Sequence, residues 1–221
     1  MHIEPGVVTG AKLFLSYATA AGAATYVTRE AIKTLHLGDL PVTLARAVAA
    51  TAAVFVFFEV FPHHAVGVSE VHLILGSTLF LTLGLVPAAI GLAMGLLLQG
   101  LFFAPFDLPQ YFMNVTTLLV PLFALSALAK RLIAPHTAYA DITYRQALVL
   151  STAYQGGVVA WVAFWVLYGE GVSAASLVNV ATFGIAYMSV ILLEPLIDLA
   201  VLAGAKAIGR NRFVLSRVYT A

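Results

Sequence analysis

The sequence predicts an all-α membrane protein with seven transmembrane helices, or six as the alternative, with its N-terminus outside and its C-terminus inside. Of the 221 residues, 62% are apolar and only 10% are charged, whereas a soluble domain carries about 25% charged residues. The mean hydropathy is +0.99, and apolar stretches long enough to cross a bilayer recur along the chain. No linker or repeat divides the chain, so residues 1–221 are expected to form one domain with an N-terminal tail over residues 1–7.

The expected spans follow the apolar stretches in order, at residues 8–28, 42–61, 71–84, 86–103, 112–130, 147–168 and 175–203. The third and fourth stretches are separated only by a short segment that ends at Pro87, which favours a turn between two spans. Reading them as one long helix gives the alternative of six spans. Gly91 and Gly95 in the fourth stretch have the spacing of small residues at which membrane helices pack closely.

Basic residues predict the orientation, because Lys and Arg concentrate on the cytoplasmic side of membrane proteins. With seven spans, all basic residues except Lys12 fall on one side, in three regions: Arg29, Lys33 and Arg46; Lys130, Arg131 and Arg145; and Lys206, Arg210, Arg212 and Arg217. Six spans would divide these regions between the two sides. The N-terminus is therefore expected outside, in a multi-pass protein of the cell's inner or plasma membrane.

Several classes of function are disfavoured by what the sequence lacks. The chain has no cysteine, so any metal ligands must be nitrogen or oxygen atoms. The net charge of +1 gives no reason to expect nucleic acid as a partner. No phosphate-binding loop is present, since Gly204 to Ala207 lacks the remainder of that motif, so ATP hydrolysis would require another chain. No nucleophile signature indicates an enzyme. Glu4 replaces the basic region of a signal peptide, so the mature chain is expected to keep Met1.

The N-terminal tail is the first candidate metal site. Met1 and His2 offer three nitrogen atoms within short reach: the α-amine, the His2 backbone amide and the His2 ring. Such nitrogens suit a transition metal such as Ni²⁺, Co²⁺ or Cu²⁺.

A second candidate site lies between residues 62 and 76, on the expected outer side. This segment holds His63, His64, Glu70 and His72. His72 is expected within the first turns of the third span, where a histidine is costly unless it is paired or functional. The alternatives are a His72 that bonds a backbone carbonyl, interfacial loop roles for His63 and His64, and a Glu70 that favours a helix start.

Three stretches resemble the cobalt/nickel substrate-binding permease of energy-coupling-factor (ECF) ABC transporters: Met1 to Gly6, Pro62 to Leu73, and Leu96 to Phe103. The resemblance implies that the amine, the residue-2 amide and the His2 ring bind the metal, and that His72 completes a nearly square set. It also implies Ni²⁺ or Co²⁺ as substrate, with no permanently bound cofactor. The implied partners are a transmembrane coupling subunit, an ATPase pair and often a small accessory membrane subunit.

The chain departs from the family pattern near His72, where Glu70 and Val71 precede it and the His63–His64 pair has no clear counterpart. His63, His64 and Glu70 thus stay open as additional ligands or supporting groups. Gln99 and Asn114 are candidates to orient the ligands, and Glu59 is a further candidate.

Glu194 and Asp198 flank Pro195 in the last span, where they either contact a coupling subunit or face an internal cavity beside a kink. Two other functions compete with metal uptake. A haem or metal redox protein would need two ligands in facing spans, and His72 is the one histidine expected within a span. An ion-coupled secondary transporter would show paired repeats with broken helices, which the sequence lacks.

Overall fold

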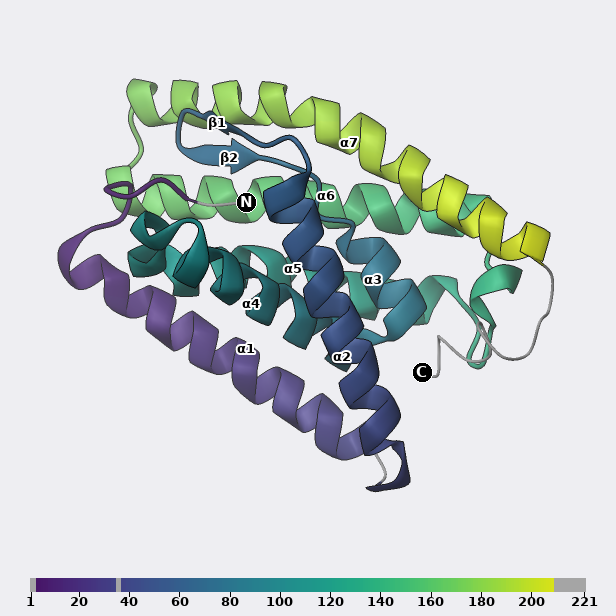
Figure 1. The fold of residues 1–221 in the computed structure, drawn as a ribbon. Coiled ribbons are helices and arrows are strands. Elements are labelled where there is room, and N and C mark those ends of the chain that lie inside the picture. Colours follow the sequence, from purple (N-terminus) through teal and green to yellow (C-terminus); the bar gives the residue numbers. More distant parts are fainter. Residues whose placement is uncertain (1–2, 35–36, 209–221) are drawn as a thin grey trace.

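The computed structural model describes residues 3–34 and 37–208. Its long helices run alongside one another, so that most of their ends gather at two opposite ends of the molecule (Figure 1). The helices of the described residues are α1 Leu13–Thr34, α2 Leu40–Phe55 (continued by a π-helical turn, Val56–Val60), α3 Gly76–Leu83, α4 Leu85–Phe102, α5 Tyr111–Leu132, α6 Tyr144–Glu170 and α7 Ala174–Ile208. Two short strands, β1 His64–Val66 and β2 Ser69–Val71, form an antiparallel hairpin between α2 and α3.

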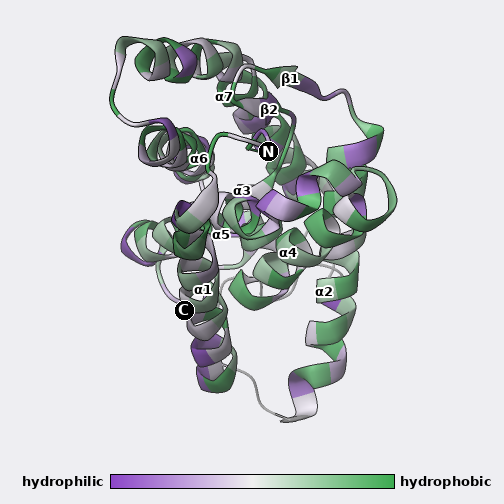
Figure 2. Cartoon of the chain, turned by 90° about the vertical axis from the view of Figure 1, so that its left-hand side faces the viewer, coloured by the Kyte–Doolittle hydropathy of each residue, from purple (hydrophilic) through white to green (hydrophobic). Residues whose placement is uncertain are grey.

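Among the described residues, five segments are long and apolar enough to cross a membrane: Leu40–Val60, Leu85–Phe102, Pro105–Leu132, Tyr144–Glu170 and Ala174–Ala207. They correspond to five of the seven expected spans, and hydrophobic residues line them along most of their length (Figure 2). The expected span at 8–28 corresponds to α1, which begins later and ends in a charged stretch with Arg29, Glu30 and Lys33. The expectation of an all-α membrane protein is confirmed at this level.

The helix expected over residues 71–84 is wrong. β2 ends at Val71, the chain then runs without regular structure to Leu75, and only Gly76–Leu83 is helical. Eight helical residues rise about 12 Å, far less than the roughly 30 Å hydrocarbon core of a bilayer. His72 therefore lies in a non-helical stretch and not in the first turns of a helix. The alternative of one long helix through α3 and α4 is also wrong, because Gly84 (φ +92°) separates them.

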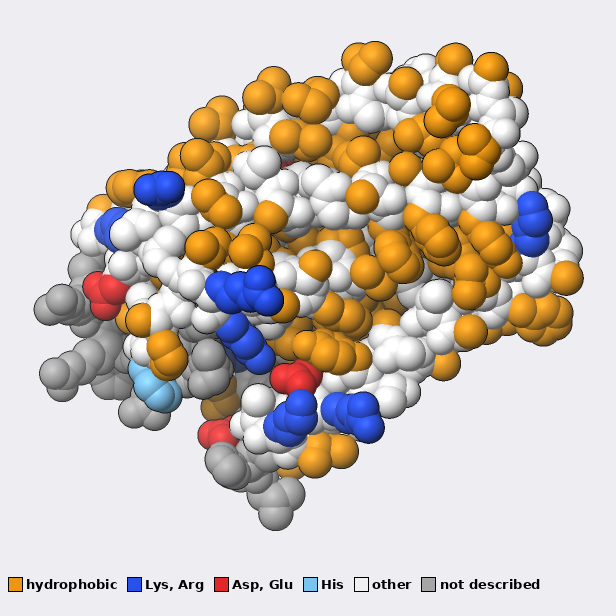
Figure 3. Space-filling model, turned by 180° about the vertical axis from the view of Figure 1, so that it is seen from behind, with side chains coloured by type: hydrophobic (Ala, Val, Ile, Leu, Met, Phe, Trp, Pro, Cys, Tyr) orange, Lys and Arg blue, Asp and Glu red, His pale blue; other side chains and the backbone are white. Residues whose placement is uncertain are grey.

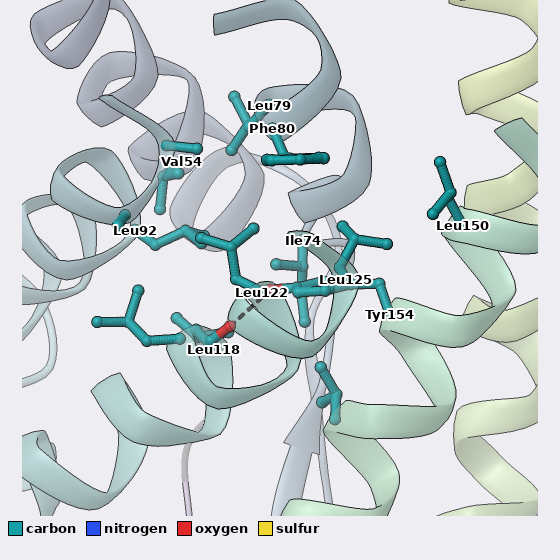
Figure 4. Packing of buried hydrophobic residues seen from close by; sticks show 14 of the residues in the cluster. Val54, Ile74, Leu79, Phe80, Leu92, Leu118, Leu122, Leu125, Leu150 and Tyr154 are labelled. Carbon is teal, nitrogen blue, oxygen red and sulfur yellow. Dashed lines mark hydrogen bonds between the residues drawn. The ribbon is translucent and has the colours of Figure 1, made fainter. Parts of the chain in front are cut away.

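The core forms where α4, α5 and α6 meet α2 and α3. Leu92, Leu118, Leu122 and Tyr154 are fully buried there (Figure 4), and the Tyr154 hydroxyl donates a hydrogen bond to the Leu118 carbonyl at 3.4 Å. On α4, a Cβ added at Gly91 would lie 2.3 Å from the Ala50 Cβ, and one at Gly95 would lie 2.5 Å from Val54 Cγ1. The close packing expected at these two glycines is confirmed: they let α4 approach α2.

The loops sort into two ends in the grouping that the charge pattern predicts. At one end, Lys12 Nζ donates to the Gly169 carbonyl at 2.8 Å. At the other, Lys206 Nζ donates to the Ala140 carbonyl at 2.6 Å. Basic side chains gather towards one end of the face shown in Figure 3, and apolar side chains cover its middle. This distribution is that of a protein with a lipid-facing belt and a basic end.

Candidate metal centre

The N-terminal tail enters the bundle beside the hairpin. Met1 and His2 lie outside the described residues, but Ile3 is fully buried. The Ile3 N–H donates to Asn114 Oδ1 at 2.7 Å, and Ile3 forms an antiparallel bridge with Ser69. The Glu4 N–H donates to the Val68 carbonyl at 3.0 Å. The tail thus pairs with the start of β2 through a single bridge and contacts α5 through Asn114.

Apolar packing also holds the tail in place. Ile3 and Val8 form a small buried cluster with Met113 of α5 and Trp165 of α6. One turn beyond Trp165, Gly169 lets the tail pass close to α6, since an added Cβ would lie 2.0 Å from the Val7 carbonyl oxygen. The docking of the tail therefore depends on residues from two distant helices.

His72 is the buried histidine of the described residues, with 2% of its surface exposed. Its ring packs against Phe58, with ring centroids 4.3 Å apart, and its Nδ1 lies 3.0 Å from the Leu73 carbonyl oxygen. Because a carbonyl oxygen only accepts, this contact puts the proton of the neutral ring on Nδ1, which leaves the lone pair on Nε2. A histidine that binds metal through one nitrogen usually donates from the other in this way. From the sequence, a contact with a backbone carbonyl is the alternative to a ligand role for His72. The structure shows this contact, which is compatible with a ligand role.

Gln99 and Asn114 are buried on either side of this region, at 3% and 1% exposed. Gln99 Nε2 donates to the Phe58 carbonyl at 3.4 Å and to Glu59 Oε2 at 3.3 Å. Gln99 thus supports the turn whose Phe58 ring packs on His72, whereas Asn114 supports the tail.

The other candidates of the 62–76 segment are more exposed. His63 and His64 are both exposed, and His63 Nδ1 lies 3.2 Å from the Phe61 carbonyl oxygen. His64 is paired with Val71 across the hairpin, and the half-buried Glu70 is paired with Ala65. The structure thus places the histidine pair on the surface of the hairpin and His72 in the interior.

A small cavity adjoins the Asn114 side of the tail. Its lining residues are Leu96, Gly100, Asp107, Leu108, Tyr111 and Asn114. Within residues 3–34 and 37–208, no group of three or more His, Asp or Glu side chains is placed to hold a metal ion.

Comparisons with known proteins identify the family of the chain. Residues 2–211 match the family model of the cobalt uptake substrate-specific transmembrane region, CbiM. The chain belongs to the CbiM family. As a member of this family, it is a membrane component of cobalt or transition-metal uptake rather than an enzyme.

Two solved structures share the fold of this CbiM-family chain. One, described as a truncated transition metal transporter, has a TM-score of 0.71 and 18% identity, with 94% of this chain and 99% of that chain covered. The other, a transition metal transporter, has a TM-score of 0.70 and 18% identity, with 94% and 93% covered. A comparison with curated proteins finds no match.

One feature of the region escaped the sequence analysis, and a second was predicted only in part. The pairing of the tail with Val68 and Ser69 joins residues far apart in sequence, and no local pattern signals it. Glu194 and Asp198 face the interior of the CbiM fold, at 0% and 3% exposed. Glu194 accepts from the Ile74 N–H just before α3, and Asp198 accepts from Ser77 in α3. Both acids stand out in the sequence because such groups are costly in an apolar span, but these partners were not predicted.

Proposed function

We propose that this CbiM-family chain captures Ni²⁺ or Co²⁺ from the outer side of the membrane as the substrate-binding component of an ECF-type uptake system. The observation that carries the proposal is the docking of Ile3, which is buried, bonded to Asn114 and bridged to Ser69. Ser69, the partner of Ile3, lies three residues before His72, so the described chain begins beside the segment that leads to this histidine.

The direction of the tail supports a site at His72. Glu4 lies beside Val68 and Ile3 beside Ser69, so the chain traced from residue 4 to residue 3 follows the hairpin strand towards His72. Two further residues extend at most about 7 Å. In the proposal, Met1 and His2 occupy that distance and meet His72 Nε2.

Met1 and His2 would supply the α-amine, the His2 amide and the His2 ring, and His72 the fourth nitrogen. The first three form two chelate rings with little ordering of the chain, and a deprotonated amide offsets part of the charge of the metal. Four nitrogens in a plane suit Ni²⁺ and Co²⁺, between which this donor set does not choose. Because protons compete for the amine, amide and imidazole nitrogens, affinity should fall as the pH falls.

A membrane enzyme or electron carrier that uses haem is less well supported. It would require two histidines from facing helices, and among the described histidines His63, His64 and His136 are exposed while His72 is buried. The ATP-driven step is assigned to partners: a coupling transmembrane subunit, a pair of ATPase subunits and a small accessory membrane subunit.

The proposal is tested by adding one residue before Met1. The addition converts the primary amine into a peptide nitrogen and displaces it, so Ni²⁺ and Co²⁺ affinity of the purified protein, measured by isothermal titration calorimetry, should fall by about 100-fold or more. A chain with one residue added after Ala221 is the matched control and should bind as the native chain does. Equal affinity in all three chains would contradict a role of the amine.

A further inference from the structure

Glu194 of α7 is buried against the stretch that follows His72. It lies within the candidate span Ala174–Ala207, yet it is fully removed from the surface. One carboxylate oxygen accepts a hydrogen bond from the Ile74 N–H, and the other accepts one from Gln155 Nε2. The Tyr187 hydroxyl in turn donates to Gln155 Oε1 at 2.5 Å. Helices α6 and α7 therefore hold the Glu194 carboxyl group in one orientation.

Asp198 holds the next part of the chain. It lies one helical turn beyond Glu194 and accepts hydrogen bonds from the hydroxyl groups of Ser77, at 2.5 Å, and Thr78. Gly76 begins α3 directly against α6, since an added Cβ would lie 2.3 Å from the Tyr154 ring. The first turn of α3 is thus fixed to α6 and α7.

The stretch between His72 and α3 needs such support. Residues 72–75 are not helical, and Leu75 has a left-handed conformation with φ +52°. Non-helical backbone at membrane depth is tolerated only where the protein itself satisfies the backbone hydrogen bonds. Glu194 does this for the Ile74 N–H, two residues after His72.

We propose that Glu194 is a positioning residue for metal capture. By accepting the Ile74 N–H it holds residues 72–75 in their non-helical conformation, and this conformation sets the direction of His72 Nε2. Asp198 holds the first turn of α3, which directly follows residues 72–75, and so fixes the other end of this stretch. The proposal rests on the proposed function, in which His72 is a ligand. It adds that a residue of α7 controls the orientation of this ligand.

The test compares Ni²⁺ binding by purified full-length variants, with calorimetry for affinity and the visible ligand-field absorption band for the nitrogen donor set. Glu194→Ala leaves the Ile74 N–H without its acceptor, so affinity should fall by about 10- to 100-fold and the band should move to longer wavelength as His72 leaves the metal. Glu194→Gln keeps an oxygen acceptor and should restore most of the affinity and the native band. Glu170→Gln is the matched control, because Glu170 lies at the exposed end of α6 bonded to Asn179, and should behave as the native chain does.

A folded Glu194→Ala chain with native affinity and band would overturn the proposal. So would equal losses in the Ala and Gln variants with an unshifted band, since these indicate a weakened bundle and not a misplaced ligand. If thermal unfolding shows that Glu194→Ala does not fold, Gln155→Met decides: it removes the donor that orients Glu194, so native affinity and band in that variant would also overturn the proposal. Failure of the native chain to bind Ni²⁺ would instead contradict the proposed function.

Discussion

At the scale of single residues, burial divides the histidines around the hairpin into two kinds. His72 is 2% exposed and packs on Phe58, and its Nδ1 makes a hydrogen bond with the Leu73 carbonyl. His63 and His64 are exposed to the surroundings. A ligand that must hold a metal in a fixed geometry needs a ring locked by packing and by a hydrogen bond, and the His72 ring meets both conditions.

This division predicts opposite outcomes for two alanine variants. His72→Ala removes a proposed ligand, so Ni²⁺ affinity should fall by at least about 100-fold, beyond the loss typical of a supporting group, and uptake should be lost. His64→Ala removes an exposed side chain and should change affinity by no more than about threefold. Binding to purified protein and metal uptake by cells measure the two effects. Loss of binding in His64→Ala alone would move the site to the hairpin surface.

Single residues of the site could be predicted where local chemistry singles them out. A histidine in an apolar stretch is costly to bury, and this cost drew attention to His72. Gln99 and Asn114 were candidates because their amide groups could orient the ligands. Ser69 carries no such cost, and its bridge to Ile3 depends on a contact between distant segments. Such contacts follow from the whole fold and cannot be read from a local pattern.

At the scale of elements, the docked tail depends on the close approach between its backbone and α6. A Cβ at Gly169 would lie 2.0 Å from the Val7 carbonyl oxygen and 2.9 Å from Val8 Cγ2. Neither atom belongs to the far end of a flexible chain, so the tail itself must shift to make room.

Gly169→Ala should therefore separate tail docking from folding. We expect Ni²⁺ affinity to fall by about tenfold or more, while the thermal unfolding temperature changes little, because the tail lies outside the main core. Gly156→Ala is the matched control on the same helix, since a Cβ there meets no atom within 4 Å, and it should bind as the native chain does. Native affinity in the Gly169 variant would show that the tail tolerates displacement.

The elements themselves were predictable from hydropathy except around α3. The apolar stretch 71–84 has the composition of a span, and composition is the same whether the chain is helical or extended. What breaks the helix is the buried acceptor on α7 and the left-handed Leu75. Both are supplied by tertiary structure, so the apolar pattern of that stretch indicated the wrong element.

At the scale of the whole molecule, the two ends of the bundle differ in charge and in the loops they carry. The end with the tail, Lys12 and Gly169 is the proposed outer end, and the end with Ala140 and Lys206 is the proposed inner end. The charge rule predicts this orientation because it acts on the whole chain and not on one helix.

The orientation can be tested with single cysteines, because the native chain contains none. Val172→Cys lies in the loop between α6 and α7, where Val172 is 80% exposed, and Ala134→Cys lies in the exposed loop after α5. A membrane-impermeant maleimide applied to intact cells should label the first variant and spare the second, and permeabilised cells should show both labelled. The reverse pattern in intact cells would invert the proposed topology.

The long-range anchoring of Ile3 also has a consequence for synthesis. The residues that hold the tail are Ser69, Asn114, Trp165 and Gly169. The ribosome adds all four of them after residue 3. Chains are made from the N-terminus onwards, so the first residues to emerge cannot dock until α6 has been inserted. The tail must therefore remain undocked on its own side of the membrane until α6 is in place.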